Sequence, residues 1–479
     1  MGQPRTATAL SVEKAPTRTG ATPTWRGKLC VMIRGLALAV VIATAGCLDV
    51  PPPANTQDAQ TSDARTNDAR TNDAFVANCG GPSDFNGRSW PPGGMEIGIR
   101  EIIAADVNAD GNLDLILTNA EVSDNEDWGL FVMLGPQTDP SNLQYHAFVP
   151  TNVIPWSVAA VDLNGDQCAE LISFGLNKAA DAGLIDVYEQ ISQTHTWDPA
   201  IQKNVDGFLP IGDGAPVLIT FGDFDGDGVS LDLAISDLTR LYVFHSLGAT
   251  PLISLQTATA TPVGRTGPPG TWTDINALFA DPAANPATAA NDLVVVEENG
   301  MTWLQNNGSG AFGSPFTSNS SGVFISRTAK RVDLDQTPPL DIIAGSGSDF
   351  GAYLLARNGT TIELQTRPWN GDVPTSNALN DVLVGNIGGT DLPEVVVIEA
   401  DENMVAKGFA YLVDGVSSGA TQLSPSIGSA FDFPGEHMTT GVITDFNGDD
   451  DDEAWIFAPN GDVKCLQRNP GGPNLQVCQ

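Results

Sequence analysis

An acidic loop between two short apolar segments recurs seven times in this chain of 479 residues. One copy, VAAVDLNGDQCAELIS, runs from Val158 to Ser173 and shows the pattern, in which one apolar run enters the loop and another leaves it. Successive loops begin 52 to 61 residues apart, at Asp106, Asp162, Asp223, Asp281, Asp333, Asn386 and Asp445. Seven units of nearly equal length predict one repeat architecture rather than several independent domains.

Each unit has room for about four strands of five or six residues. Four-stranded units around a ring form a β-propeller, whereas an open solenoid would need capping repeats that the sequence lacks. We therefore predict an all-β fold, a seven-bladed β-propeller with about four antiparallel strands per blade, over residues 78–479. The last unit has four candidate strands of its own. The ring is therefore expected to close either unaided or with a sealing strand from residues 82–98. The strands expected in the first unit are Ile102–Ala105, Leu113–Leu117, Gly129–Leu134 and Tyr145–Val149.

The acidic loops carry oxygen ligands at alternate positions, which is the pattern that calcium requires. Calcium binds six to eight oxygens at about 2.3–2.6 Å, and a Gly at the sixth position lets the backbone turn tightly around the ion. Without a cation, carboxylates so close together would raise one another's pKa. The predicted ligands of the first loop are the side chains of Asp106, Asn108, Asp110 and Asp114 and the carbonyl of Asn112.

Three further loops carry comparable sets of ligands. These are Asp162, Asn164, Asp166, Cys168 and Glu170 in the second loop, Asp223, Asp225, Asp227 and Asp232 in the third, and Asp445, Asn447, Asp449, Asp451 and Glu453 in the seventh. The fifth loop keeps Asp333, Asp335 and Asp341 and is predicted to bind calcium weakly. The sixth, from Asn386 to Glu394, is predicted to hold no ion, and the fourth, from Asp281 to Asp292, is too irregular for a prediction. The expected cofactor is Ca²⁺ at four strong sites and one weak site.

An EF-hand is the main alternative for such loops, but it needs a bidentate Glu at position 12 and flanking helices. Here the last acid stands at position 9 or 10, between strand-like segments. The loops and their flanks resemble the FG-GAP and VCBS-type repeats of integrin α-chain propellers and many bacterial surface proteins, over about residues 98–479. Several copies lack the Gly, and three lack part of the acid set. The resemblance implies that calcium stiffens the blade loops and that ligands bind on a propeller face or through loop insertions.

The N-terminal segment has the pattern of an export signal. An apolar stretch at 35–45 follows basic residues, is too short to span a bilayer, and ends in small residues before Cys47. This ending resembles a bacterial lipobox, so we predict a signal peptide over 1–46, with Met32 as a possible alternative start, and a lipidated Cys47. A plain secretory signal that discards Cys47 is the alternative. Residues 47–77, which include a low-complexity repeat, are predicted to be a disordered linker.

The remaining cysteines suggest disulfides in an exported chain. Cys465 and Cys478 fall on neighbouring candidate strands, which favours that pair and leaves Cys79 with Cys168 by elimination. A clasp between Cys79 and Cys478, or free buried thiols, are the alternatives.

P-loop and H-E-x-x-H patterns are absent from the sequence, and the protein is predicted not to be an enzyme. The four histidines do not stand in metal-ligand spacing, which argues against zinc. The tryptophans do not recur once per repeat, which weakens a lectin interpretation, and most are expected in the core.

A net charge of −36 disfavours nucleic-acid partners. By resemblance to Gram-negative lipoproteins, Leu48 after Cys47 favours the outer membrane, facing the periplasm or the cell surface, with membrane contact through the lipid alone. We predict a monomeric, calcium-binding lipoprotein that acts as a non-enzymatic adhesion or protein-binding module with a protein or glycan ligand. The alternatives are a carbohydrate-binding or polysaccharide-processing propeller and a purely structural envelope protein.

Overall fold

The apolar runs that flank the acidic loops form antiparallel strands, and the described residues contain no α-helix. No helix within this part of the chain is therefore long and apolar enough to cross a membrane. The described residues all belong to the unit Pro53–Gln479. The computed structural model describes residues 88–93, 97–120, 128–139, 142–163, 168–177, 182–191, 196–205, 218–227, 231–236, 240–245, 260–263, 275–281, 290–297, 300–308, 311–312, 316–319, 330–332, 341–346, 349–358, 361–368, 378–387, 394–400, 407–413, 431–434, 440–448, 451–458, 461–469 and 475–478.

Seven four-stranded sheets, here called blades one to seven, follow one another along the described chain, and the strands of each blade pair in sequence order. Blade one holds β2 (Ile99–Ala105), β3 (Asp114–Asn119), β4 (Gly129–Met133) and β6 (Ala147–Pro150); blade two holds β7 (Ile154–Val161), β8 (Glu170–Asn177), β9 (Ala182–Ile191) and β10 (Thr196–Val205); blade three holds β11 (Leu218–Gly222), β12 (Asp232–Ser236), β13 (Leu241–Phe244) and β14 (Ala260–Pro262); blade four holds β15 (Ile275–Asp281), β16 (Asp292–Glu297), β17 (Gly300–Leu304) and β18 (Phe316–Asn319). Blade five holds β19 (Lys330–Val332), β20 (Asp341–Ser346), β21 (Asp349–Asn358) and β22 (Thr361–Pro368); blade six holds β23 (Ala378–Gly385), β24 (Glu394–Ala400), β25 (Lys407–Val413) and β26 (Phe431–Pro434); blade seven holds β27 (Thr440–Thr444), β28 (Glu453–Phe457), β29 (Val463–Arg468) and β30 (Leu475–Val477).

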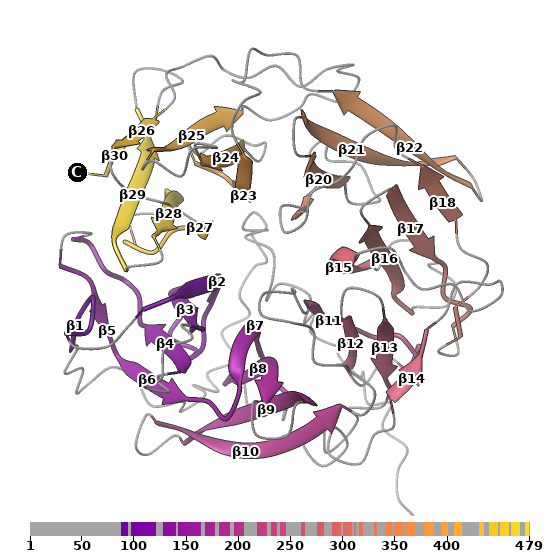
Figure 1. Cartoon of the computed structure of the whole chain (residues 1–479), viewed down its shortest axis with the longest axis horizontal. Coiled ribbons are helices and arrows are strands. Elements are labelled where there is room, and N and C mark those ends of the chain that lie inside the picture. The colour runs from indigo at the N-terminus through magenta and orange to yellow at the C-terminus, as the bar shows by residue number, and fades with distance from the viewer. Residues whose placement is uncertain are drawn as a thin grey trace, which may run out of the picture. The chain divides into compact units, whose positions relative to one another are not determined.

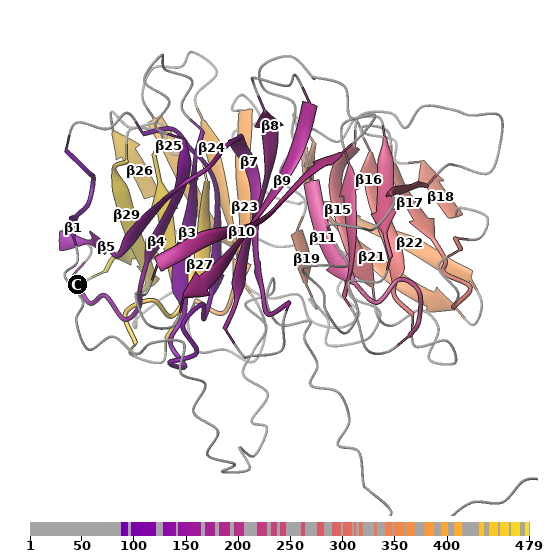
Figure 2. The same ribbon diagram turned by 90° about the horizontal axis from the view of Figure 1, so that it is seen from below.

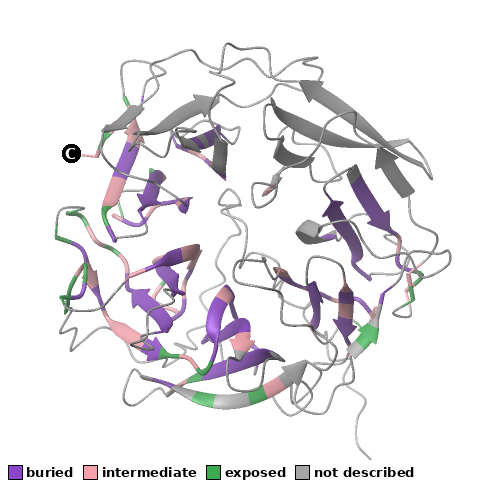
Figure 3. Ribbon diagram, in the orientation of Figure 1, coloured by how far each residue is buried: buried purple, intermediate pink, exposed green. Residues whose placement is uncertain are grey.

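Four of the second strands are buried along their whole length. Every residue of β3, β12, β16 and β28 is buried (Figure 3). Their sequences are accordingly apolar without alternation, as in Leu115–Leu117 and Leu293–Val296, because each face of such a strand meets another blade.

The blades stand around a common axis with their first strands innermost (Figures 1 and 2). Six neighbouring pairs of blades are joined by contacts that involve these first strands, including β2 with β7 and, across the ends of the chain, β2 with β27. Apolar clusters fill the seams between blades; one of them packs Ile172 and Phe174 of blade two against Ile219 and Ile235 of blade three. The predicted all-β propeller is confirmed.

Within the part of the chain that the structure describes, the ring closes without a strand from the N-terminal segment. All four strands of blade seven come from the C-terminal part of the chain, so the first of the two predicted routes is the one observed. The short strand β1 (Arg88–Ser89) instead pairs with β5 (Gln144–Tyr145) as a separate two-stranded sheet. The strand expected over Tyr145–Val149 is thus divided between β5 and β6, with His146 between them.

Trp90 joins the first blade to the last. The centroid of its indole ring lies 5.0 Å from the centroid of the Phe131 phenyl ring in blade one and 6.3 Å from that of the Phe457 phenyl ring in blade seven. Its Nε1 donates a hydrogen bond of 2.8 Å to the carbonyl of Gly461, between β28 and β29. A residue that precedes all seven blades therefore packs on both sides of the closing seam.

A disulfide joins Cys465 on β29 to Cys478, which follows β30. Their backbones are also paired, since the N–H of Cys478 donates to the carbonyl of Cys465 at 3.0 Å. Cys168 is disulfide-bonded as well, and its predicted partner, Cys79, lies outside the described residues. Cys47, the signal peptide and the linker also lie outside them.

We expect Trp90→Ala to lower the free energy of unfolding by about 3 kcal/mol, because it removes a large apolar contact on both sides of the seam. Urea denaturation measures the change. Arg88→Ala is the control, since Arg88 is exposed and contributes only a cation–π contact of 5.9 Å with Tyr145, and we expect a loss below about 1 kcal/mol. Equal losses in the two variants would contradict a seam-spanning role for Trp90.

Candidate metal-binding loops

The acidic loops connect the first strand of each blade to the second, and the second strand begins at an acid in all seven blades. Each of these acids pairs in register with the last residue of the first strand, as Asp114 does with Ala105. Where the side chain is described, at most 1% of the residue is exposed; these residues are Asp114, Glu170, Asp232, Asp292, Glu394 and Glu453. An ionised carboxylate in such a place requires hydrogen bonds or a cation.

In blades one to three, this buried carboxylate accepts a hydrogen bond from the second residue of its own loop. The donors are the N–H groups of Val107, Leu163 and Phe224, at 2.9, 2.6 and 2.8 Å. The side chains of the same three residues are at most 3% exposed. An apolar residue at the second position thus anchors the loop in the core. The sequence analysis missed this role because it considered only the alternating acids.

Loop one turns back so that its polar side chains face its own backbone. Asp106 accepts hydrogen bonds from the N–H groups of Asp110 and Gly111, at 3.1 and 2.8 Å. Asp110 in turn accepts from Asn108 Nδ2 at 3.1 Å and from the N–H of Asn112 at 2.8 Å. The structure therefore brings these predicted ligands together in one tight turn.

Burial raises the pKa of Asp106 and holds the pKa of Asp114 well above its usual range. The negative charge of Asp110 raises both values further. Two backbone N–H groups, those of Gly135 and Val107, oppose the shift at Asp114. The loop therefore concentrates negative charge that a bound cation would stabilise.

Loop three gathers a second group of acids. Asp223 accepts from the N–H of Gly226 at 2.6 Å, and Asp225 accepts from the N–H of Asp227 at 3.1 Å. One carboxylate oxygen from each of Asp223, Asp225 and Asp227 lies within 4.8 Å of the others. Burial raises the pKa of Asp225, and the charges of Asp232, Asp227 and Asp223 raise it further.

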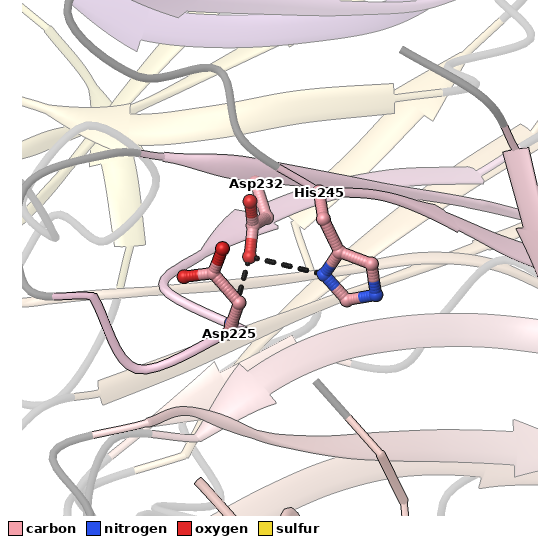
Figure 4. A group of neighbouring side chains, drawn as sticks. All are labelled: Asp225, Asp232 and His245. Carbon is pink, nitrogen blue, oxygen red and sulfur yellow. Dashed lines mark hydrogen bonds and ion pairs between the residues drawn. The ribbon is translucent and has the colours of Figure 1, made fainter. Parts of the chain in front are cut away.

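His245 completes a neighbouring group that the sequence did not indicate (Figure 4). Its Nδ1 lies 3.4 Å from Oδ2 of Asp232, an oxygen that also accepts from the N–H groups of Phe224 and Asp225. The hydrogen bond with Asp232 raises the pKa of His245. The histidines are not in metal-ligand spacing along the chain, and the proximity of His245 to Asp232 arises instead across a strand pair.

The second and seventh loops are described in part. In loop seven, Asp445 accepts from the N–H of Gly448 at 2.8 Å, and Glu453 accepts from Asn447 Nδ2 at 2.8 Å; Asp451 is exposed. In loop two, Asp162 is half-buried and Glu170 is buried; Cys168, predicted among the ligands, is buried and disulfide-bonded, so its sulfur is not available to a metal ion. The predicted ligands outside the described residues are Asn164, Asp166, Asp333, Asp335 and Asp449. Asp341 begins β20, but its side chain is not described.

The backbone takes a left-handed conformation at the fourth position of three loops. Ala109, Gly226 and Gly448 have φ of 56°, 74° and 79°. The Gly expected at the sixth position of loop one, Gly111, is left-handed as well, with φ of 87°. In loops three and seven, this turn directs the fourth N–H to the first acid, so the fourth position is a shared feature that the sequence analysis missed.

In blades four and six, the protein itself stabilises the buried acid. Asp292 accepts from Trp303 Nε1 and from the N–H of Asn306, both at 2.7 Å. Glu394 accepts from the guanidinium of Arg468, on β29 of the neighbouring blade, at 2.9 Å. These donors have no counterpart in the loop sequences themselves.

The chain was compared with known proteins. No protein-family model matches it, and no curated protein does. A crystal structure of BBS1N in complex with ARL6DN is similar over 80% of this chain and 96% of that chain, with 11% identity and a TM-score of 0.48. A lectin of Agrocybe aegerita that recognises non-reducing terminal N-acetylglucosamine is similar over 72% of this chain and 82% of that chain, with 13% identity and a TM-score of 0.45. At these scores the matches support no statement about function.

We expect Arg468→Met to lower the free energy of unfolding by about 3 kcal/mol, because it leaves the carboxylate of Glu394 buried without its cation. Chemical denaturation measures the loss. The double variant Glu394→Gln/Arg468→Met is the control and should recover part of it, since the remaining amide is uncharged. If Arg468→Met is as stable as the parent chain, the guanidinium does not stabilise this acid.

Proposed function

We propose that the loops of blades one, two, three and seven bind Ca²⁺, that the loop of blade five binds it more weakly, and that the chain is an FG-GAP/VCBS-type propeller. The observation that carries this proposal is the gathering of carboxylates in loops one and three around a tight backbone turn. Carboxylate and carbonyl oxygens are the ligands that calcium prefers.

A contrast between the blades supports the assignment. Where a loop departs from the acidic pattern, as in blades four and six, neutral or cationic side chains donate to the buried acid. In loops one and three, further acids stand beside it and raise the pKa values of Asp106, Asp114 and Asp225. A divalent cation at these loops would relieve the repulsion that remains.

We further propose that the chain is exported, anchored through Cys47 in the outer membrane, and acts there as a monomeric, non-enzymatic adhesion or protein-binding module. The leader, the lipobox-like ending and the spacer before the ring support the tether. A ring of blades packed through apolar seams supports a rigid surface for a large partner. The tryptophans within the described part of the chain, which are Trp90, Trp128, Trp156, Trp197, Trp303 and Trp455, are buried or half-buried, so none of them offers an exposed platform for a sugar ring.

The calcium proposal predicts a melting temperature that depends jointly on metal and pH. A carboxyl whose pKa is raised by folding contributes stability that is present at low pH and is lost as pH rises through the raised pKa. The metal-free chain should therefore have a lower free energy of unfolding at pH 7 than at pH 5. Calcium at 100 times its dissociation constant adds about 2.7 kcal/mol per site. We expect metal removal to lower the melting temperature by several degrees at pH 7 and by less at pH 5.

Differential scanning calorimetry with and without calcium at both pH values measures these shifts. Asp225→Asn should reduce the calcium effect, whereas Asp139→Asn, an exposed position outside the loops, should not. Identical melting curves with and without calcium at pH 7 would exclude the calcium proposal.

The binding role is tested separately by affinity capture. The purified chain, immobilised with calcium, should retain defined surface proteins, and metal removal should release them if the loops stiffen the binding face. A deletion strain should show reduced surface attachment. Unchanged attachment together with no retained partner would contradict the binding role and leave the calcium proposal standing.

A further inference from the structure

We propose that the loop of blade three is a mixed nitrogen–oxygen site for a divalent transition metal ion of the Zn²⁺ class, bound by Asp225, Asp232 and His245. The proposal rests on the proposed metal-binding role of the loops and gives this one loop a different metal preference. One ligand atom from each of the three residues lies within 4.8 Å of the other two. Figure 4 shows the Nδ1 side of the imidazole ring turned toward the two carboxylates.

The separation of the ligand atoms fits a small ion. Zinc binds imidazole nitrogen and carboxylate oxygen at about 2.0–2.2 Å, and two such ligands of a tetrahedral ion are about 3.4 Å apart. His245 Nδ1 and Asp232 Oδ2 are 3.4 Å apart. A charge-assisted hydrogen bond between an imidazolium and a carboxylate would be shorter, about 2.7–2.9 Å. The 3.4 Å separation is therefore compatible with two ligands of one metal ion, and the third ligand atom, from Asp225, lies within 4.8 Å of both.

The strand register places His245 at this point. Leu233 of β12 pairs with Phe244 of β13, so His245 stands across from Asp232, one residue beyond the last pair. Asp232 is fully buried, and a quarter of the His245 side chain is exposed. The corresponding described residues of five other blades are not histidine, and neither is residue 414, which follows the last pair of blade six and lies outside the described residues; the five are Leu134, Glu189, Gln305, Leu354 and Gln467.

The nitrogen ligand determines which metal ion this site would prefer. Calcium takes oxygen ligands, whereas imidazole suits zinc, copper, iron and nickel. Asp225 belongs both to this group and to the oxygen-only group with Asp223 and Asp227. One loop therefore offers calcium an outer, more exposed set of oxygens and offers a transition metal an inner set that includes nitrogen. The two ions should compete at blade three and at none of the other predicted calcium loops.

The test uses the full chain, purified without a histidine tag and freed of metal, with Co²⁺ as a spectroscopic probe at fixed pH. We expect one Co²⁺ per chain to give a visible absorption spectrum typical of nitrogen and oxygen ligands, and Zn²⁺ to displace it. His245→Phe keeps a ring at this position but removes the nitrogen, and should weaken Co²⁺ binding by about ten-fold or more. His146→Ala is the matched control and should bind Co²⁺ as the parent chain does, because His146 packs on Trp197 away from the loop.

Calcium binding, measured on the same preparations by isothermal titration calorimetry, distinguishes failure of the transition-metal site from failure of the calcium proposal. Equal Co²⁺ affinity in the parent chain and in His245→Phe would overturn the transition-metal site while leaving calcium at the loops intact. A parent chain that binds neither ion would overturn both proposals. If His245→Phe also loses calcium at the other loops, its fold is altered, and His245→Gln then decides by the same comparison of Co²⁺ affinities.

Discussion

Each described acid at the start of a second strand is buried, and its charge must be stabilised before the blade can pack. The strand pairing fixes the acid opposite the end of the first strand, beneath the loop that joins the two, where water is excluded. Transfer of an ionised carboxylate to such a place costs several kcal/mol unless donors or a cation compensate. The loop sequences, the tight turns and the neighbouring side chains can all be understood as ways to meet that cost.

The blades meet this shared requirement by different means. Blade four supplies an indole and a backbone N–H, and blade six supplies a guanidinium from the next blade. Loops one and three add further acids instead, which raises the local pKa values and suits a mobile cation from solution. Blade three has an imidazole beside its acid as well. The repeat therefore conserves a place for positive charge or strong donors, while the source of that charge varies around the ring.

The sequence predicted what depends on local pattern. The repeat spacing, the strands on either side of each loop and the gathering of Asp106 with Asp110 all follow from residues that are close in the chain. The partners of the buried acids did not follow, because Arg468 meets Glu394 across a blade boundary and His245 meets Asp232 only through strand register. The apolar anchors Val107 and Phe224 were visible between the acids, but their role depends on burial that a loop sequence does not reveal. The sequence left two routes for closing the ring, and the pairing of β1 with β5 rather than with blade seven decides between them.

The position of Trp90 bears on how the ring responds to mechanical load. Among the described residues, β1 and Trp90 come first in the chain, and their contacts reach both the first and the last blade. A pull on Trp90 would therefore load the closing seam from both of its sides rather than one terminal sheet alone. A residue that belongs to neither terminal sheet would thus resist their separation under force.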